Sequence, residues 1–408
     1  MKKIIIIDTS YTLTDFENRG SLNVIYARDL GKYFEKVYSI HPLADLTNKK
    51  LILNKKYYKF TKLNNIHYFY EFSCNEFKKF RFLNPFIFIY FQSKMIFKII
   101  RLINDEKINF IKGGDSLYAG LIALILSKIT KKNLFIRVGS NNNKIRHEIK
   151  KPIQKKFYQF IFIERFFEKI IVKHSSHIFP ANYDNEKYIN SIYKCSHKST
   201  VIRYGPLIND CHYIDPRKRV VNSKLINEII SNNEKLLIFI SRLEKEKLIF
   251  DVVDVFKKLS ENHNNIKLII IGDGSQKNNL KKCISKYNLD KKIVLVGEKK
   301  QIWISEILSV CTLVLSPHTG RALCEASLAG SLIVAYDIDW QSEIIEHYKS
   351  GFLVEYKNID KMFYYSNQIL NNYKKYSTLG FNLRNKALEI LDKEKSTKDE
   401  INVYNKFI

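Results

Sequence analysis

The chain contains no CxxC or CxxH pair, and its six cysteines are scattered along 408 residues. This spacing argues against a zinc site and against a disulfide framework, so we expect a protein of a reducing compartment. No uncharged apolar run reaches the roughly 18 residues that a membrane-spanning helix needs. The apolar start stops at Asp8 after four isoleucines, which indicates a buried first strand rather than a signal peptide.

Acidic residues are scarce in the first half of the chain. Residues 1–205 contain 37 Lys and Arg but only 16 Asp and Glu, a balance of +21, whereas the remaining residues have a balance of +6. The excess cations alternate with aromatic residues at 55–60, 77–82 and 155–158. This combination suits an anionic membrane surface, and it suits nucleic acid less well. The alternative is that lysine is simply the commonest solvated residue of this chain.

Short apolar runs alternate with helical patterns along the whole sequence, which predicts an α/β protein. In the first half we expect strands at 4–7, 36–40, 109–112, 134–138, 178–180 and 201–203, and helices at 22–33 and 117–129. Amphipathic patterns at 86–103 and 157–172 predict two further helices, which either face the core or lie on a membrane.

The pattern starts again near Gly205-Pro206. We therefore expect two facing Rossmann-like domains with a cleft between them. The boundaries predicted are 1–205 for the N-terminal domain and 206–384 for the C-terminal domain. A last helix at about 385–408 is expected to pack back on the first domain.

In the second half, apolar runs at 238–240, 269–271, 313–315 and 333–336 each end in a turn of Gly, Ser or charged residues. A parallel sheet binds its ligands at the carboxyl ends of its strands, so these turns predict a nucleotide-type site. Arg242 follows the first of these strands and is a cation that does not titrate. Lys247 is expected to begin the next helix and to add a second charge at its positive end.

Residues 236–356 resemble the nucleotide-binding domain of the retaining GT-B glycosyltransferases, in particular glycosyltransferase family 4, the group 1 glycosyl transferases. The similar segments, in the family's order, are Ser241-Arg242-Leu243 with Lys247, Gly272-Asp273-Gly274, Val296-Gly297, Ser316-Pro317, Glu325-Ala326 and Ser350-Gly351-Phe352-Leu353-Val354. The first half resembles the family only in its order of elements and its basic surface.

The resemblance implies a metal-independent, retaining transfer of a hexose-type sugar from a nucleotide diphosphate sugar, with no cofactor besides this co-substrate. Arg242 and Lys247 would stabilise the leaving diphosphate, and Glu325, which we expect to open a helix at 326–328, would accept the ribose hydroxyls. Four glycines are expected around the donor: Gly20, Gly272, Gly274 and Gly320.

The sequence departs from the family at several positions. Pro317 stands where the family usually has its first Glu, so we expect His318, Thr319 and Arg321 to arrange sugar recognition instead. Asp339 and Trp340 stand where the family often has two glycines, and they are candidates for a sugar or acceptor pocket, although Trp340 could equally be a packing residue. Family members often place a His at a strand end facing the donor sugar, but the strand ends at 112–115 and 138–141 have none, which leaves Asp115 as a catalytic candidate and Asn141 as a sugar or acceptor contact.

The expected acceptor is a glycan in a lipid-linked form that is extended in the biosynthesis of a capsule, lipopolysaccharide or similar surface polysaccharide. The resemblance implies that the N-terminal domain faces the acceptor and the membrane, and that the C-terminal domain binds the nucleotide-sugar donor. Such an enzyme would be cytoplasmic and peripheral on the inner face of the cell membrane. Two alternatives stay open: a GT-B nucleotide-sugar epimerase or phosphorylase, and a non-catalytic basic scaffold or nucleic-acid-binding protein. The missing first Glu favours the scaffold, whereas the joint presence of Arg242, Lys247 and Glu325 argues against it. The sugar, the base, the linkage and the oligomeric state are not determined by these patterns.

Overall fold

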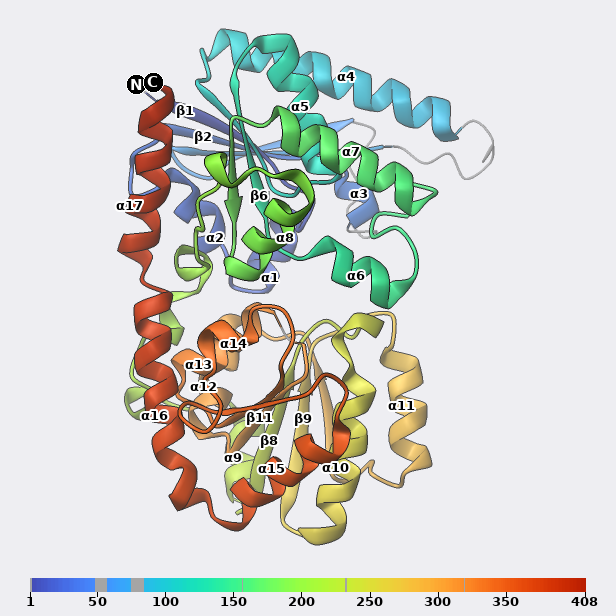
Figure 1. Cartoon of the computed structure of the whole chain (residues 1–408), viewed down its shortest axis with the longest axis vertical. Coiled ribbons are helices and arrows are strands. Elements are labelled where there is room, and N and C mark those ends of the chain that lie inside the picture. The colour runs from blue at the N-terminus through green and yellow to red at the C-terminus, as the bar shows by residue number, and fades with distance from the viewer. Residues whose placement is uncertain (1, 48–56, 75–83, 156, 232, 319) are drawn as a thin grey trace. The chain divides into compact units, whose positions relative to one another are not determined.

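The computed structural model describes residues 2–47, 57–74, 84–155, 157–231, 233–318 and 320–408. The chain divides into two compact units, which Figure 1 shows with their labelled elements. The N-terminal unit comprises Met1–Arg203 together with Lys393–Ile408, and the C-terminal unit comprises Tyr204–Asp392. The first division falls two residues before the boundary expected from Gly205-Pro206.

In the N-terminal unit, the described strands form one sheet in the order β3-β4-β2-β1-β5-β6-β7. All neighbours are parallel except β3, which runs antiparallel to β4. The strands are β1 (Lys3–Ile7), β2 (Lys36–His41), β3 (Tyr58–Lys62), β4 (His67–Phe72), β5 (Phe110–Gly113), β6 (Asn133–Val138) and β7 (His177–Pro180). The isoleucine run of β1 is buried throughout, as expected for a central parallel strand covered on both faces.

Helices cover both faces of this sheet. They are α1 (Leu13–Asn18), α2 (Asn23–Tyr26), α3 (Ala44–Thr47), α4 (Asn84–Asp105), α5 (Tyr118–Thr130), α6 (Asn142–Ile149), α7 (Ile161–His174), α8 (Tyr183–Tyr193) and α17 (Lys393–Tyr404). Helices α4, α5 and α7 lie side by side on one face, and α17 lies along the unit at its other side (Figure 1). Two apolar clusters, one on each face, form the core.

In the C-terminal unit, the described strands form a parallel sheet in the order β10-β9-β8-β11-β12-β13. The strands are β8 (Lys235–Ile240), β9 (Ile266–Ile271), β10 (Ile293–Gly297), β11 (Leu313–Ser316), β12 (Ile333–Tyr336) and β13 (Phe352–Val354). The helices are α9 (Lys224–Ser231), α10 (Ile249–Asn262), α11 (Lys277–Lys286), α12 (Gln301–Val310), α13 (Arg321–Leu328), α14 (Gln341–Ile344), α15 (Ile359–Asn371) and α16 (Tyr373–Ile390).

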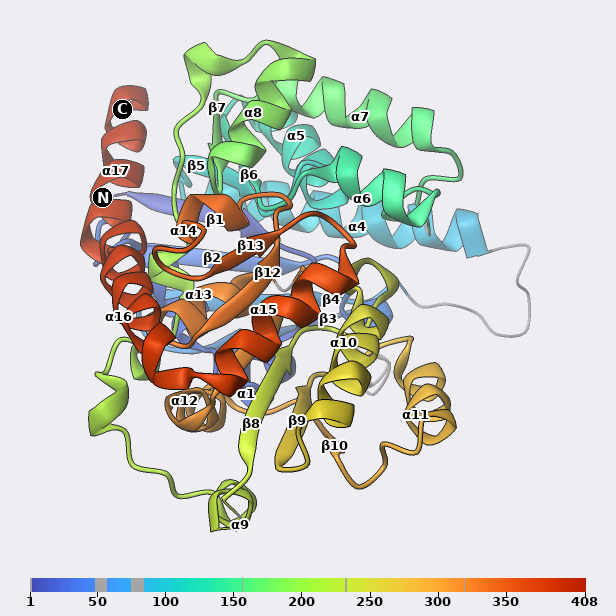
Figure 2. The same cartoon turned by 60° about the horizontal axis from the view of Figure 1, so that its bottom comes forward.

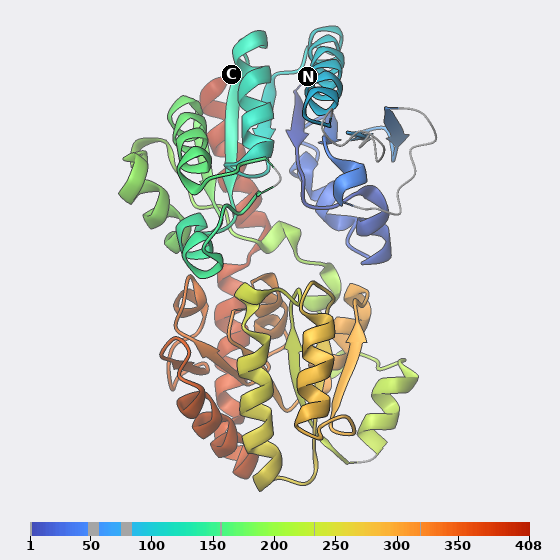
Figure 3. The same cartoon turned by 90° about the vertical axis from the view of Figure 1, so that its right-hand side faces the viewer.

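The helices of the C-terminal unit also lie on both faces of their sheet (Figures 2 and 3). Side chains of α10, α11 and α15 pack on one face, and side chains of α12, α13, α14 and α16 pack on the other. Two Rossmann-like α/β units are therefore present, as the strand and helix patterns predict. No helix within the described ranges combines the length and the apolarity needed to cross a bilayer.

Several expected elements of the N-terminal half are wrong in detail. The helix expected at 22–33 is instead a short α2 followed by a 3-10 turn. It is preceded by α1, a helix that was not expected. Thr12 starts α1 with a capping box, in which its hydroxyl accepts from the Asp15 backbone N–H and Asp15 accepts from the Thr12 backbone. A capping box is a local signal that can be read directly from sequence.

Two other differences concern strands. Strands β3 and β4 were not expected. They form where Tyr and Phe alternate with polar residues at strand spacing. No strand forms at 201–203, although Ile202 donates a backbone hydrogen bond to the carbonyl of Pro180 at the end of β7. The helix expected at 157–172 begins only at Ile161.

Candidate functional site

The carboxyl edge of the C-terminal sheet collects most of the residues singled out from the sequence. Because β9, β8, β11 and β12 are adjacent and parallel, the turns that follow them meet at one edge. The turn after β8 carries Arg242 and Lys247, and the turn after β9 carries Gly272 and Gly274. His318 and Gly320 follow β11, whereas Asp339 and Trp340 follow β12.

The turn after β8 holds two cations. The Arg242 side chain is 58% exposed and forms an ion pair with Glu246, with 3.4 Å between Nη2 and Oε1. Lys247 closes a 3-10 turn at Lys245–Lys247 and so precedes α10, rather than beginning it as expected. Burial, together with the neighbouring Arg242, lowers the pKa of Lys247 to about 8. A ligand with negative charge would relieve that repulsion.

The glycines after β9 support this turn through close backbone packing. A Cβ added to Gly272, whose φ is +138°, would lie 1.9 Å from the Ser241 carbonyl oxygen. A Cβ on Gly274 would lie 2.5 Å from the Leu243 oxygen. The Leu243 N–H donates to the Asp273 carbonyl over 3.0 Å, which joins the two turns. Both glycines are therefore required for the backbone that positions Arg242, whether or not they contact a ligand.

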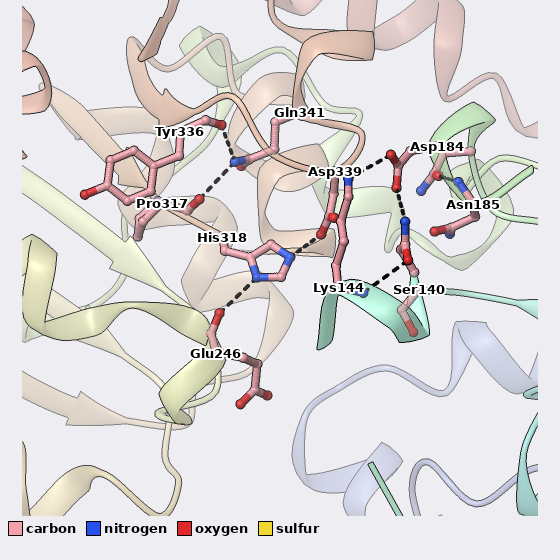
Figure 4. Close-up of polar contacts among 12 residues, drawn as sticks. Ser140, Lys144, Asp184, Asn185, Glu246, Pro317, His318, Tyr336, Asp339 and Gln341 are labelled. Atoms are coloured by element: carbon pink, nitrogen blue, oxygen red, sulfur yellow. Dashed lines mark hydrogen bonds and ion pairs between the residues drawn. The ribbon is translucent and has the colours of Figure 1, made fainter. Parts of the chain in front are cut away.

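His318 joins three of the turns, as Figure 4 shows. Its Nδ1 lies 2.9 Å from the Glu246 carbonyl oxygen in the turn after β8, and its Nε2 contacts the Asp339 carboxylate after β12. A carbonyl oxygen only accepts, so Nδ1 carries a proton. The ring is therefore held on both sides, by the turn after β8 and by the turn after β12.

Asp339 and Trp340 occupy backbone positions that explain part of their unusual identity. Asp339 has a φ of +53°, a left-handed conformation that Gly adopts easily and Asp tolerates better than most residues. Its carboxylate and the His318 ring are both largely buried. Trp340 is buried, precedes α14 and packs near the Tyr204 ring, with 6.0 Å between ring centroids. The contacts of Trp340 fit the packing alternative.

Gln341 is a residue of this edge that the sequence reasoning missed. Its amide nitrogen donates to the carbonyls of Pro317 and Tyr336, over 3.0 and 2.7 Å, and its amide oxygen accepts from the Ser316 hydroxyl over 3.1 Å (Figure 4). One buried side chain thus ties the end of β11 to the end of β12. The only sequence signal is a polar residue at the start of a short helix, which is too common to be diagnostic.

Helix α13 carries the remaining candidates of this unit. It begins at Arg321, so Glu325 lies within the helix and does not open it at 326–328 as expected. Gly320 precedes the helix with a φ of +67°, and no atom would oppose a Cβ there, so the backbone is open on that side. Burial raises the pKa of Glu325 to about 7, although Arg321 acts in the opposite direction. Thr319 lies outside the described residues.

In the N-terminal unit, Asp115 follows β5 and lies near the end of β1. Its Oδ2 accepts from the Thr9 hydroxyl over 3.2 Å, and its Oδ1 accepts from the Leu117 N–H over 2.7 Å. Burial raises the pKa of Asp115, and the nearby Asp8 contributes in the same direction. Such a carboxyl holds a proton more readily than an ordinary aspartate does.

Asn141 and Gly20 have clear structural roles. The Asn141 side chain caps α6 by accepting from the Lys144 N–H over 3.3 Å, and it donates to Asp184 over 3.3 Å. Gly20 follows α1 in a left-handed turn with a φ of +61°. Neither observation places a ligand, so their predicted contacts with sugar, acceptor or donor stay predictions.

The sequence reasoning also missed an ion pair at the end of β1. Arg28 Nη2 lies 2.5 Å from Asp8 Oδ2, and Arg28 Nη1 donates to the Ser39 hydroxyl over 2.8 Å. Burial acts to raise the pKa of Asp8, but Arg28 and Ser10 outweigh it and hold this pKa below its ordinary value. The two residues are 20 positions apart: Asp8 follows β1, and Arg28 lies in the 3-10 turn Ala27–Asp29 that precedes β2.

Comparison with known proteins agrees with this geometry. Residues 223–386 match the family model described as "Glycosyl transferases group 1". The poly(ribitol-phosphate) alpha-N-acetylglucosaminyltransferase of Staphylococcus aureus is 28% identical over 175 residues, which cover 42% of this chain and 36% of that protein. The alpha-monoglucosyldiacylglycerol synthase of Acholeplasma laidlawii is 34% identical over 128 residues, which cover 30% and 32%.

Similarity extends along the whole chain at the level of structure. The crystal structure of Anabaena HepE in complex with UDP and glucose aligns with a TM-score of 0.74 at 16% identity, covering 100% of both chains. In sequence, the chain spans about half or less of the curated relatives it matches, 52%, 36% and 46% of the first three. Residues 223–386 therefore form a domain of the group 1 glycosyl transferase family, within a chain that has the GT-B glycosyltransferase fold.

Proposed function

We propose that this chain is a glycosyltransferase that moves a sugar from a nucleotide diphosphate sugar to a glycan acceptor in the synthesis of a surface polysaccharide or glycolipid. The observation that carries the proposal is the set of groups at one sheet edge of a group 1 domain: two cations after β8, the His318 ring joined to their turn, and the buried Glu325. These groups match the phosphates and the ribose of one nucleotide.

The diphosphate is assigned to the turn after β8. Arg242 and Lys247 lie five residues apart there, and Arg242 contributes to lowering the pKa of Lys247. As the bond from the anomeric carbon to the diphosphate breaks, negative charge develops on the leaving oxygen, and preorganised cations stabilise it. His318 contacts both Glu246 of this turn and Asp339, which joins the turn to the ends of β11 and β12.

The nucleoside is assigned to α13. Once it is ionised, the carboxylate of Glu325 accepts hydrogen bonds from the two ribose hydroxyls. Gly320 lets the phosphates approach the backbone. Relatives in structure support a uridine donor as the first probe, because HepE crystals contain UDP, UDP-glucose, or UDP with glucose. The sugar specificity of this chain is assigned to His318 and its neighbours after β11.

We further propose that the transfer retains the anomeric configuration and needs no metal. The acceptor oxygen forms its bond on the face from which the diphosphate leaves, and the leaving oxygen takes the acceptor's proton. Asp115 and Asn141 of the N-terminal unit are assigned to the acceptor side. A lipid-linked acceptor and a location on the inner face of the cell membrane complete the proposal, and a glycolipid synthase among the relatives supports them.

The test of the donor site is thermal stabilisation by UDP-glucose and UDP in buffer with EDTA. The wild type should gain several degrees, and Arg242→Ala should lose at least about 90% of the affinity, because a charge-assisted contact to phosphate contributes about 1.5–3 kcal/mol. Lys245→Ala is the matched control, since Lys245 is an exposed cation of the same turn. A panel of other nucleotide sugars identifies the preferred donor.

The outcomes separate the alternatives. If no nucleotide diphosphate stabilises the wild type, or if Arg242→Ala responds like Lys245→Ala, the donor site is not where we place it. Turnover of the bound nucleotide sugar without an acceptor, with a change at one sugar carbon, would identify an epimerase instead. NMR of the product's anomeric proton decides between retention and inversion.

A further inference from the structure

Helix α4 of the N-terminal unit presents one face on which aromatic and cationic side chains alternate. Tyr90, Lys94, Phe97 and Arg101 follow one another at spacings of three or four residues, and Lys98 lies four residues after Lys94, so the five share one face of the helix. Tyr90 and Phe97 are 60% and 69% exposed. A soluble protein normally turns such rings toward its core, so this face suggests a binding role.

A groove of about 650 Å³ lies beside this face. On the sheet side it is lined by Ile40 of β2 and by Tyr70 and Phe72 of β4, and Tyr57 also contributes. Ile40 and Phe72 are buried, which gives the groove an apolar floor, whereas Tyr90 and Phe97 lie exposed along its α4 side. The groove therefore offers apolar and aromatic surface below and cations along one wall.

Two of the cations of this wall, Lys94 and Lys98, lie over aromatic rings. Lys94 Nζ lies 4.2 Å from the centroid of the Tyr57 ring, and Lys98 Nζ lies 4.4 Å from that of Tyr58. Within the described residues, none of Lys94, Lys98 and Arg101 forms an ion pair with a carboxylate. Cations held by ring faces keep their charge available, so an anion at the mouth of the groove would be attracted.

Helix α7 continues this character on the same side of the sheet, with α5 between it and α4 (Figure 1). Its inward face holds Glu164 and Glu168, both fully buried and paired with Arg146 of α6 over 2.7 and 2.8 Å. Its outward face holds Phe162 and Phe166, which are 69% and 58% exposed. Ile171 and Val172 are also buried in the last turns of α7, so only the first part of the helix has acids inside and phenylalanines outside. The outer face of that part fits an apolar partner.

We propose that the α4 groove binds the anionic phospholipid surface of a membrane, with Lys94, Lys98 and Arg101 at the lipid phosphates and with Tyr90 and Phe97 in the interfacial layer. The exposed phenylalanines of α7 enter the same layer. Cations paired with rings and backed by an apolar floor match a surface that is charged outside and apolar beneath. This inference rests on the proposed function in one respect: a lipid-linked acceptor lies in a membrane, which gives the enzyme a reason to bind one.

The test is co-sedimentation of the full chain with vesicles of phosphatidylglycerol and phosphatidylcholine, compared with vesicles of phosphatidylcholine alone. We expect binding to the anionic vesicles, weakened roughly tenfold or more in Lys94→Gln/Lys98→Gln/Arg101→Gln, since each cation near such a surface contributes about 1 kcal/mol. The matched control is Lys281→Gln/Lys282→Gln/Lys286→Gln, which removes the same charge from the exposed face of α11.

A second pair of variants tests the apolar contribution. Phe97→Ser and Phe162→Ser/Phe166→Ser change exposed side chains and so should leave folding intact, while each weakens vesicle binding at constant charge. Equal loss in the α4 and α11 charge variants would show general attraction by net charge and would overturn the groove. Unchanged binding in the α4 variant, or preferential binding of single-stranded nucleic acid with the same three cations, would overturn it too.

The same variants are measured for stabilisation by UDP-glucose, which separates this inference from the proposed function. If vesicle binding fails while the nucleotide still stabilises the protein, the groove is wrong and the donor site stands. If the nucleotide fails while vesicle binding depends on the α4 cations, the surface stands and the enzyme assignment does not.

Discussion

At the scale of single residues, the carboxyl edge of the C-terminal sheet contains two groups whose pKa values are shifted close to neutral pH. Burial raises the pKa of Glu325 to about 7 and lowers that of Lys247 to about 8. Both shifts disfavour the charged form, so both groups are poised to gain from a ligand that pairs with the charge. Desolvated groups of this kind are typical of binding sites.

The stability of the protein should reveal Glu325 through its pH dependence. The pKa of this acid is raised by folding, so its stabilising effect is complete below about pH 4.5 and is lost as pH rises to about 7. Glu325→Gln removes that loss and should gain up to about 3 kcal/mol relative to wild type between pH 5 and pH 8. Urea unfolding at the two pH values measures the difference, and a pH-independent difference would contradict the assignment.

His318 and Asp339 should act as a unit on the donor site. Both lie in segments where this chain departs from the family that it resembles, and the two side chains contact each other. Asp339→Gly keeps the left-handed backbone and removes the carboxylate, and His318→Ala removes the ring. In a double-mutant cycle on UDP-glucose affinity, we expect a coupling energy of about 1 kcal/mol or more. Additive losses would show that the contact does not serve the donor.

At the scale of elements, the turns after β8 and β9 depend on each other. Gly272 allows the β9 turn to touch the Ser241 carbonyl, and this contact supports the turn that carries Arg242. The same logic joins β11 to β12 through Gln341. Backbone contacts of this kind set the geometry of the edge before any ligand arrives.

Gly272→Ala should therefore be far more damaging than an ordinary glycine substitution. The added Cβ would meet the Ser241 oxygen at 1.9 Å, so the two turns must separate, at a cost of about 3 kcal/mol or more. Gly297→Ala is the control, because its φ of +70° is strained but its Cβ meets no atom within 4 Å, which predicts a cost of about 1 kcal/mol. Chemical unfolding of both variants gives the comparison, and equal costs would refute the packing argument.

At the scale of the whole molecule, the chain leaves the N-terminal unit after Arg203 and returns to it at Lys393. Gly205 and Leu391, near the two crossing points, touch: a Cβ on Gly205 would lie 2.3 Å from the Leu391 carbonyl oxygen. Helix α17 then completes the N-terminal unit. Glu400 pairs with Lys112 of β5 over 2.5 Å, and Tyr404 is fully buried among the rings of Phe34, Phe110 and Phe135.

Tyr404→Ala should destabilise the N-terminal unit although the residue lies four positions from the chain's end. Loss of a fully buried aromatic side chain costs about 3–5 kcal/mol. Calorimetry should show a lower transition for the N-terminal unit, while stabilisation of the C-terminal unit by UDP-glucose persists. Tyr373→Ala, which removes a 44% exposed tyrosine, is the control, and a comparable loss in that variant would argue against the packing role of α17.

The local sequence alone was sufficient for the two-unit α/β architecture, because buried parallel strands are continuous apolar runs and their turns carry recognisable residues. The order Arg242, Gly272, Glu325 along the chain also sufficed to locate the group 1 domain. Local patterns failed where strands are short and aromatic, as in β3 and β4, and where a helix begins at an uncapped residue, as α13 does at Arg321.

Only the tertiary structure decided which side chains meet. His318 and Asp339 are 21 residues apart, and Arg28 and Asp8 are 20 apart, yet the folded chain brings each pair into contact. It also decided that Phe162 faces outward while Glu164 faces inward, which helical periodicity alone would reverse. The physical reason is that burial and pairing depend on which elements are neighbours in space, whereas a sequence pattern records only the neighbours along the chain.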